Sequence, residues 1–249
     1  MIFYFSGTGN SYAVAKQIAE HIEGEQVIPL VKFNDFKQCD HAERIGIVFP
    51  CYGGRAPDIV LDFKNELFKH VNKSDQYIFA VITYANSPVG AYLDFKENIN
   101  AWFKVKMPEN DTYGAVPIPS PEKEKTMLAQ SMTLINRFIE DILNKKAVIM
   151  YRPIPGFGFL SKQAYKHVKN LHKDFGKKLY ADEKCIRCKQ CTKYCPVQNI
   201  TFDAKPVWGI NCINCCGCVN RCPKDAIQVG NKTQNKRRYV HPDYKNIYY

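Results

Sequence analysis

The chain has 249 residues, enough for one large domain or two smaller ones with a buried core. Its hydrophobic content of 45% is ordinary for a soluble globular protein, and no apolar run approaches the roughly 18 residues of a membrane span. Residues 1–143 contain 14 Lys and Arg against 18 Asp and Glu, whereas residues 144–249 contain 21 against 6, which predicts two modules with different surfaces.

The first residues after Met1, "IFYF", have the pattern of a β-strand and leave no room for a signal peptide. We therefore expect a cytoplasmic protein. The chain has 11 cysteines. In the cytoplasm so many cysteines indicate metal or redox chemistry rather than disulfides.

Strand and helix patterns alternate through residues 1–143. The apolar runs predict strands at Ile2–Phe5, Val27–Val31, Ile45–Phe49, Tyr77–Thr83 and about Phe103–Met107, with an open continuation at Tyr113–Ile118. The amphipathic stretches between them lie near residues 11–23, 58–70, 89–100 and 122–144. This β-α-β-α order predicts an α/β domain whose parallel sheet is covered on both faces.

A loop of small and hydroxylated residues, "SGTGNS", joins the first predicted strand to the first predicted helix. Such a loop can wrap backbone N–H groups and hydroxyls around a phosphate at a helix N-terminus. It is not a Walker loop, since no G-K-[ST] follows, and Tyr12 at the third glycine position excludes the dinucleotide fingerprint. The pattern S-x-T-G-x-S is similar to the FMN phosphate loop of flavodoxins, and it predicts phosphate binding by Ser6, Gly7, Thr8, Gly9, Asn10 and Ser11.

Two further loops follow the carboxyl ends of predicted strands, where open α/β sheets bind ligands. They are "FPCYGGRAPD" at residues 49–58 and "TYANSPVGAY" at residues 83–92. A small-residue role is favoured for Cys51 over reactivity, and Cys39 is expected to be structural. The candidate cofactor-binding residues in the two loops are Pro50, Cys51, Tyr52, Gly53, Gly54, Thr83, Tyr84, Ala85, Asn86 and Gly90.

A Pro- and Gly-rich stretch, "YRPIPGFGF" at residues 151–159, is predicted to be a hinge. A helix should follow it, because Leu160, Ala164, Val168, Leu171, Phe175 and Leu179 share one face at helical spacing. The opposite face has five lysines, and it is expected to be solvated surface or a docking site. These lysines are Lys162, Lys166, Lys169, Lys173 and Lys177.

Two copies of C-x2-C-x2-C-x3-C-P, "CIRCKQCTKYCP" and "CINCCGCVNRCP", lie 27 residues apart. Tandem runs of this kind bind iron–sulfur clusters, and the fourth cysteine of each run ligates the other cluster. The spacing is too specific for structural zinc, which needs C-x2-C pairs with a longer gap. One [4Fe–4S] cluster is therefore assigned to Cys185, Cys188, Cys191 and Cys222, and the other to Cys212, Cys215, Cys218 and Cys195.

Three residues in these runs depart from the simple pattern. Cys216 is surplus, and a small residue packed against the cluster is favoured over a redox-active thiol. Arg187 and Lys189 occupy places between the cysteines of the first run, where many such loops have small residues. They are either solvated surface or a docking site, and they would also stabilise the reduced cluster.

The motifs together resemble a family of flavodoxin–ferredoxin fusion proteins found in anaerobes. The similarity covers "SGTGNS", "FPCYGG", "TYANSPVGA", "VKMPEN", both cysteine runs and the late "KRRYVHPDY". It implies a flavodoxin-like five-stranded sheet of order 2-1-3-4-5, FMN, and a small α+β domain with two [4Fe–4S] clusters. The implied divisions are an FMN-binding domain at 1–147, a hinge and basic linker helix at 148–179, and a ferredoxin domain with a C-terminal extension at 180–249.

The resemblance also implies how the flavin is held. In flavodoxins the two later loops enclose the isoalloxazine ring, so Tyr52 or Tyr84 would stack on it. Gly53 and Gly54 would let a peptide turn toward flavin N5. Ala85 departs from the family, whose third loop often has Gly at this place. "VKMPEN" and "KRRYVHPDY" have no evident mechanism at this stage.

The predicted function is electron transfer between FMN and two [4Fe–4S] clusters, with an acidic redox partner such as a ferredoxin or an oxidoreductase. A flavin-dependent reductase of a quinone or nitro compound, and a redox subunit or activator of a larger enzyme, are the alternatives. An electron carrier is favoured over an enzyme, and no catalytic residue is assigned. No nucleic-acid motif is visible, which disfavours nucleic acid as a partner of the basic half. The oligomeric state is left open.

Overall fold

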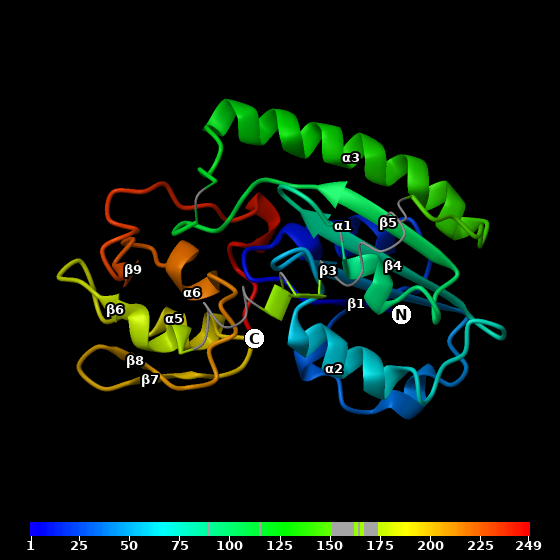
Figure 1. Ribbon diagram of the computed structural model, residues 1–249, viewed down its shortest axis with the longest axis horizontal. Helices are drawn as coiled ribbons and strands as arrows, with labels where there is room; N and C mark the ends of the chain where they lie inside the picture. Colours follow the sequence, from blue (N-terminus) through cyan, green and yellow to red (C-terminus); the bar gives the residue numbers. More distant parts are fainter. Residues whose placement is uncertain (89, 115, 151–161, 164, 167–173) are drawn as a thin grey trace.

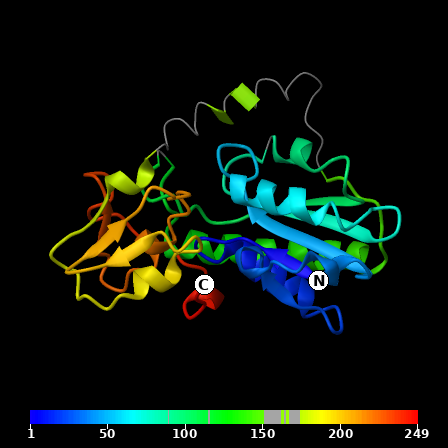
Figure 2. The ribbon, with the colours of Figure 1, turned by 90° about the horizontal axis from the view of Figure 1, so that it is seen from below.

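Two lobes make up the protein, a large one built on a parallel sheet and a small one that contains both cysteine runs (Figures 1 and 2). The computed structural model describes residues 1–88, 90–114, 116–150, 162–163, 165–166 and 174–249. The last residues of the chain return between the two lobes, so that the C-terminus lies beside the large lobe and not at the outer end of the small one (Figure 1).

The large lobe contains five parallel strands in the order β2-β1-β3-β4-β5, which confirms the predicted sheet order. Most residues of the central strands are apolar because both faces of the sheet are covered. The strands are β1 (Ile2–Tyr4), β2 (Val27–Pro29), β3 (Arg44–Pro50), β4 (Tyr77–Tyr84) and β5 (Ala101–Lys106).

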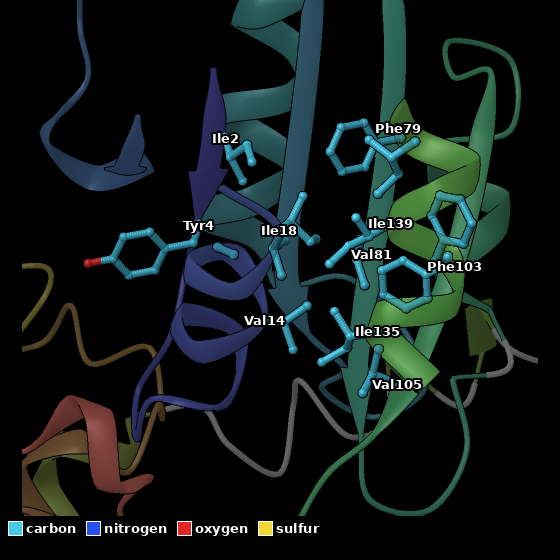
Figure 3. Close-up of a cluster of buried hydrophobic side chains, with 14 of the residues drawn as sticks. Ile2, Tyr4, Val14, Ile18, Phe79, Val81, Phe103, Val105, Ile135 and Ile139 are labelled. Carbon is cyan, nitrogen blue, oxygen red and sulfur yellow. The ribbon is translucent and has the colours of Figure 1, made fainter. Parts of the chain in front are cut away.

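Helices α1 (Asn10–Ala19) and α3 (Pro121–Leu143) cover one face of this sheet. Figure 3 shows Val14 and Ile18 of α1 and Ile135 and Ile139 of α3 directed at strand residues such as Val81. Helix α2 (Asp58–Leu67) and the 3₁₀ helix η3 (Ala91–Asp94) cover the other face. Because successive side chains of a strand point to opposite faces of the sheet, neighbouring strand residues belong to two separate cores.

The stretch at 89–100, predicted to be an amphipathic helix, forms only the 3₁₀ helix η3 followed by turns. Its apolar residues Phe95 and Ile99 are buried as the pattern predicts. The continuous helix is lost because the Asp94 carbonyl accepts a hydrogen bond from Lys64 Nζ (2.9 Å), and the Asp94 carboxylate pairs with Arg55. Tertiary contacts thus override the local periodicity here.

Two other strand predictions differ from the structure. The described residues of 113–118 form no strand, since the Asp111 carboxylate accepts the backbone N–H groups of Tyr113 and Gly114 and holds a turn (3.1 Å each). The second strand stops at Pro29. It is followed by two 3₁₀ helices, η1 (Leu30–Lys32) and η2 (Phe36–Cys39).

The small lobe consists of two antiparallel strand pairs and two short helices. Strand β6 (Leu179–Ala181) pairs with β9 (Ile227–Val229), and β7 (Ile200–Phe202) pairs with β8 (Pro206–Trp208). The helices α5 (Gln190–Tyr194) and α6 (Gly217–Asn220) each lie within a cysteine run. The 3₁₀ helix η4 (Phe175–Lys178) leads into β6, whereas η5 (Pro242–Tyr244) lies against helix α1 of the large lobe. The apolar core of the small lobe contains Phe175, Ile200, Val219 and several cysteines.

The predicted hinge at 151–159, and most of the predicted helix at 160–179, lie outside the described residues. The end of that helix prediction is wrong, because Phe175–Lys178 is a 3₁₀ helix and Leu179 is already paired with Val229 in β6. No helix in the described part of the chain is both long and apolar enough to cross a membrane.

A glycine in the centre of the sheet gives a test of the packing. Gly46 is paired with Phe79 on the neighbouring strand, and a methyl group on Gly46 would lie 2.4 Å from the Phe79 ring. We expect Gly46→Ala to lower the free energy of unfolding by about 1–3 kcal/mol, because the ring must leave its packed position. Phe79→Leu in the same chain should recover part of this loss. Urea unfolding of the single and double variants checks this, and an unchanged midpoint for Gly46→Ala would show that the ring is not confined.

Candidate functional site

A cavity of about 880 Å³ opens at the carboxyl ends of the sheet strands, where the two lobes meet. All three loops that the sequence predicts to bind a cofactor line it, with 14 of the 16 predicted residues. Gly9 and Gly90 are the exceptions. Further lining comes from residues 108–111 and from residues 212–216 of the second cysteine run.

The "SGTGNS" loop is shaped by local hydrogen bonds and one left-handed glycine. Gly9 caps helix α1 with φ of 102°, and its N–H donates to Ser6 Oγ (2.9 Å). The loop therefore leads directly into the helix N-terminus, where unpaired N–H groups favour an anion. Gly9 lies behind the loop rather than in the cavity, because a methyl group there would collide with Tyr244 Cβ at 2.3 Å.

The loop is supported by the "VKMPEN" motif, whose role the sequence did not reveal. Asn110 Nδ2 donates to Thr8 Oγ1 (2.8 Å), and Asn10 Nδ2 donates to the Pro108 carbonyl (3.0 Å). Because Asn110 donates, the Thr8 hydroxyl retains its own proton for a ligand in the cavity. Its position was the available signal, because the motif extends from the last two residues of β5 past the carboxyl end of that strand, where ligand-binding loops lie.

The 49–58 loop turns through Gly53 and Gly54, whose φ values of 55° and 84° favour glycine. Tyr52 and Arg55 close the turn by exchanging backbone hydrogen bonds of 2.9 and 3.0 Å. Gly90 supports the turn from outside the cavity, where its N–H donates to the Gly54 carbonyl (2.7 Å). The loop is thus held in place before any ligand binds.

Tyr52 and Tyr84, the two predicted stacking residues, both line the cavity. Burial raises the pKa of both phenols. The Tyr52 pKa is raised further by the nearby thiols of Cys215 and Cys216, which places this side chain toward the second cysteine run. Its buried hydroxyl has no hydrogen-bond partner among the described residues, so a ligand in the cavity could provide one.

Several thiols of one run lie near a thiol of the other run. Burial raises the Cys215 pKa to about 12, with further contributions from Cys212 and Cys195. Burial also raises the Cys191 pKa to about 11, with contributions from Cys222 and Cys188. Among the described residues, no three His, Cys, Asp or Glu side chains are placed to hold a single ion. The crossed ligand sets themselves remain a prediction.

The two runs repeat each other in backbone conformation as well as in sequence. Arg187, Lys189 and Gln198 have φ of 58°, 59° and 49°, and the residues 27 positions later, Asn214, Cys216 and Asp225, have 56°, 56° and 50°. Lys189 caps helix α5, and Cys216 caps α6. The surplus cysteine therefore occupies the helix-capping position of the second copy, between two predicted ligands.

Backbone N–H groups donate to two of the predicted ligand sulfurs. The Asn199 N–H donates to Cys195 Sγ (3.2 Å), and the Ala226 N–H donates to Cys222 Sγ (3.3 Å). Burial raises the Cys218 pKa overall, and the nearby Trp208 indole acts in the opposite direction. Such N–H···S bonds stabilise a thiolate and make a bound cluster easier to reduce.

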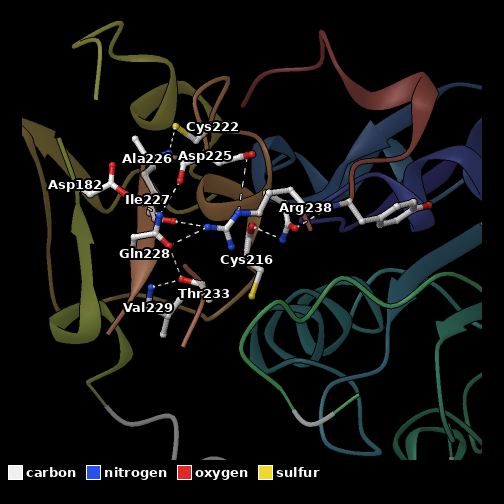
Figure 4. A network of polar contacts seen from close by, with 12 residues as sticks. Asp182, Cys216, Cys222, Asp225, Ala226, Ile227, Gln228, Val229, Thr233 and Arg238 are labelled. Atoms are coloured by element: carbon white, nitrogen blue, oxygen red, sulfur yellow. Dashed lines mark hydrogen bonds and ion pairs between the residues drawn. The ribbon is translucent and has the colours of Figure 1, made fainter. Parts of the chain in front are cut away.

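A polar network around Arg238 holds the loop that contains Cys222 (Figure 4). The Arg238 guanidinium donates to the Ile227 carbonyl (3.2 Å) and to Gln228 Oε1 (3.0 Å), and Gln228 Nε2 donates to the Asp225 carbonyl (2.8 Å). Arg238 belongs to the "KRRYVHPDY" motif, and its neighbour Arg237 pairs with Glu124 of α3. The motif thus connects the small lobe to the large one.

The residues present fit FMN and two [4Fe–4S] clusters. The cavity combines a helix N-terminus for a phosphate, the Thr8 hydroxyl as a donor, and the unpaired Tyr52 hydroxyl. The predicted cluster ligands are thiols only, the donor type that iron–sulfur clusters prefer. The FMN would contact the three loops, and the clusters would be held by Cys185, Cys188, Cys191, Cys222 and by Cys212, Cys215, Cys218, Cys195.

The phosphate loop gives a first test of the site. We expect Thr8→Val to weaken FMN binding roughly 10- to 150-fold, the loss of one charge-assisted hydrogen bond. The Asn110 amide remains as a half-buried donor in this variant, so Asn110→Leu/Thr8→Val serves as the control without an unpaired amide. Fluorescence titration at fixed pH and salt measures the affinity, and unchanged values would remove Thr8 from the site.

The surplus thiol gives a second test. Cys216→Ala should retain about eight iron atoms per chain, because the repeat places Cys216 at a capping position and Cys215 at the ligand position. Cys215→Ala should lose or destabilise one cluster. Iron and sulfide analysis with EPR, on anaerobic preparations, distinguishes the two variants, and the reverse pattern would mean that Cys216 is the ligand.

Two family models match different parts of the chain. A family model described as a flavodoxin domain matches residues 1–112, and one described as a 4Fe-4S dicluster domain matches residues 135–240. No curated protein matches the chain.

Two solved structures are similar to part of the chain. One is a flavodoxin from the domain Archaea, with 15% identity over 56% of this chain and 96% of that one, and a TM-score of 0.36. The other is the two-electron reduced flavodoxin of Megasphaera elsdenii, with 17% identity over 53% and 97% and the same TM-score of 0.36.

The sheet order and the two family models identify the two domains of the chain. A flavodoxin domain implies FMN, and a dicluster domain implies two [4Fe–4S] clusters. The chain is a flavodoxin–ferredoxin fusion, an electron-transfer protein with an N-terminal flavodoxin domain and a C-terminal 4Fe-4S dicluster domain.

Proposed function

We propose that this protein relays electrons between a redox partner and FMN, with the cluster of Cys188 as the outer centre and the cluster of Cys215 as the inner one. One observation carries the proposal: residues 212–216, which contain two predicted ligands of the inner cluster, line the same cavity as the phosphate loop. The clusters and flavin supply the electron chemistry, and the chain fixes their order.

The phosphate loop and the loop of the second cysteine run are in contact through their backbones. A methyl group on Gly7 would lie 2.1 Å from the Cys215 carbonyl oxygen, and one on Gly217 would lie 3.0 Å from the Gly7 carbonyl oxygen. No side chain fits between the phosphate loop and the predicted inner-cluster loop at this point. The glycines therefore bring the two binding loops as close as their backbones allow.

The two cluster-binding loops differ in exposure in the way that a relay requires. Cys188 is exposed, as are Arg187 and Lys189 beside it, whereas Cys218 and the capping Cys216 are buried. The exposed apolar side chain of Ile186 lies in the same loop. A basic surface with an apolar centre around an exposed cluster suits a transient encounter with an acidic redox protein, such as a ferredoxin.

A second candidate is flavin-dependent reduction of a small molecule such as a quinone or nitro compound. The cavity extends beyond the three loops to Ile59, and Asp111 lines it as well. Burial raises the Asp111 pKa to about 6, so this carboxyl could deliver a proton near neutral pH. Turnover of such a compound, lost in Asp111→Asn, would favour this candidate. A dedicated subunit or activator of a larger enzyme is a third role, which complex formation would reveal.

Two further parts of the proposal rest on the sequence. A cytoplasmic location suits a chain with eleven cysteines and oxygen-sensitive clusters. The domain limits at 1–147, 148–179 and 180–249 also remain proposals, since the family models cover 1–112 and 135–240.

The docking surface gives a test in solution. We expect reduction by an acidic ferredoxin to slow as ionic strength rises, because the Debye length falls from about 30 Å at 0.01 M to about 8 Å at 0.15 M. Arg187→Glu/Lys189→Glu should slow the reaction further at low salt and flatten its salt dependence. Stopped-flow rates at several salt concentrations, with potentials measured for both proteins, provide the measurement.

A matched control is Lys123→Glu/Lys125→Glu, which makes the same change in net charge at exposed positions of helix α3. This control should react nearly as the wild type does. Equal rates for all three proteins at low salt would contradict docking at the outer cluster. Equal slowing in both variants would show that only the overall charge matters.

A further inference from the structure

Residues 239–249 lie against the back of the phosphate loop, on the side away from the cavity. The His241 N–H donates to the Thr8 carbonyl (2.8 Å), and the Tyr239 hydroxyl donates to Asn10 Oδ1 (2.6 Å). These bonds join positions more than 200 residues apart in the chain. None of the residues 239–249 lines the cavity, although Thr8 and Asn10 do.

The Ser6 carbonyl is held by two tyrosines of the same segment. The Tyr249 hydroxyl donates to it (2.6 Å), and the Tyr244 hydroxyl lies 3.1 Å from it and 2.7 Å from the Tyr249 hydroxyl. Tyr244 is buried, and its Cβ occupies the space that a side chain on Gly9 would need. Three residues of the phosphate loop, Ser6, Thr8 and Asn10, are therefore fixed from behind.

The other side of the segment is anchored in the small lobe, between predicted cluster ligands. Arg221, which precedes Cys222, donates to the Tyr244 carbonyl (3.1 Å) and to the Ile247 carbonyl. Its guanidinium lies 3.8 Å from the centre of the Tyr194 ring and 4.6 Å from that of Tyr244. The Tyr249 N–H donates to the Lys193 carbonyl of α5 (3.0 Å).

Asn220 of helix α6 completes the connection. Its amide donates to the Asn110 carbonyl (3.0 Å), and its Oδ1 accepts the Tyr239 N–H (3.0 Å). Asn110 in turn donates to Thr8, and Tyr239 donates to Asn10. The phosphate loop, the 105–110 motif, helix α6 and the 239–249 segment thus form one closed set of hydrogen bonds.

We propose that residues 239–249 are a positioning element of the FMN site, which holds the phosphate loop in its binding conformation by anchoring it to the cluster-binding lobe. A phosphate binds best to N–H groups that are already aligned, because the loop then loses no conformational entropy when the phosphate binds. The inference rests on the proposed function, since it requires the FMN phosphate to bind in the "SGTGNS" loop. It gives the "YVHPDY" part of the late motif a role in flavin recognition without contact with the flavin.

The phosphate group itself provides the test, because riboflavin is FMN without its phosphate. Deflavinated protein with both clusters retained is titrated with FMN and with riboflavin. In Tyr244→Phe/Tyr249→Phe, which keeps both rings and removes both hydroxyls from Ser6, we expect FMN affinity to fall about two- to tenfold per hydrogen bond lost. Riboflavin affinity should remain at the wild-type value. Tyr239→Phe, which frees Asn10 instead, should act in the same direction.

Tyr77→Phe is the matched control. The Tyr77 hydroxyl also donates to a backbone carbonyl, that of Lys146 (2.9 Å), but Tyr77 begins β4 at the opposite end of the sheet from the cavity. This variant should lose a similar amount of stability with no change in the FMN-to-riboflavin affinity ratio. Thermal unfolding of each variant, measured in parallel, shows whether stability and affinity change separately.

The possible failures are distinguishable. Suppose that Tyr244→Phe/Tyr249→Phe and Tyr239→Phe bind FMN as the wild type does, or that they lose FMN and riboflavin affinity equally. Residues 239–249 then do not position the phosphate loop, and the inference fails. If the wild-type protein itself shows no preference for FMN over riboflavin, the phosphate is not bound in this loop and the proposed function fails first.

Discussion

The contact between the Gly7 backbone and the Cys215 carbonyl is the constraint on which the rest of the structure depends. It requires two binding loops from opposite ends of the chain to approach without side chains between them. Glycines permit the approach but contribute little burial, so other groups must hold the loops there. Asn110, Asn220 and Tyr239 do this with buried or half-buried hydrogen bonds. Polar partners suit the task because their directional bonds fix one arrangement, whereas apolar packing alone tolerates several.

Arg221 is a buried charged residue at the contact between the two lobes. It is only 6% exposed, and its Nε and Nη1 have no hydrogen-bond partner among the described residues. Burial lowers its pKa, with the tyrosines around it acting in the opposite direction. A buried cation with carbonyl and aromatic partners is costly in isolation. The cofactors are anionic, and Arg221 adjoins the predicted ligand Cys222, so a bound cluster would reduce this cost.

Local and periodic signals, which depend on residues near one another in sequence, allowed the parallel sheet, its two covered faces and the three cavity loops to be predicted. The sheet order came instead from the resemblance to the flavodoxin–ferredoxin family. The prediction of a helix near residues 89–100 was wrong. Arg55 and Lys64, which are distant in sequence, bind Asp94 there and prevent a continuous helix. "VKMPEN" and "KRRYVHPDY" remained without a mechanism for a related reason. Tyr239 acts on Asn10 across 229 positions, and no local pattern can indicate that pairing.

The difference between Lys189 and Cys216 follows from where each copy of the cysteine repeat lies. Both residues cap a short helix in the left-handed region, with φ of 59° and 56°. Lys189 is in solvent, where its ammonium is hydrated and lies 5.7 Å from the centre of the Phe202 ring. Cys216 is buried between the lobes beside Asp111, and the pKa of its thiol is raised by that burial. A long charged side chain there would need desolvation and space between the phosphate loop and helix α6. A small neutral thiol needs neither, which agrees with the prediction that Cys216 is a packed capping residue and that Cys215 is the cluster ligand.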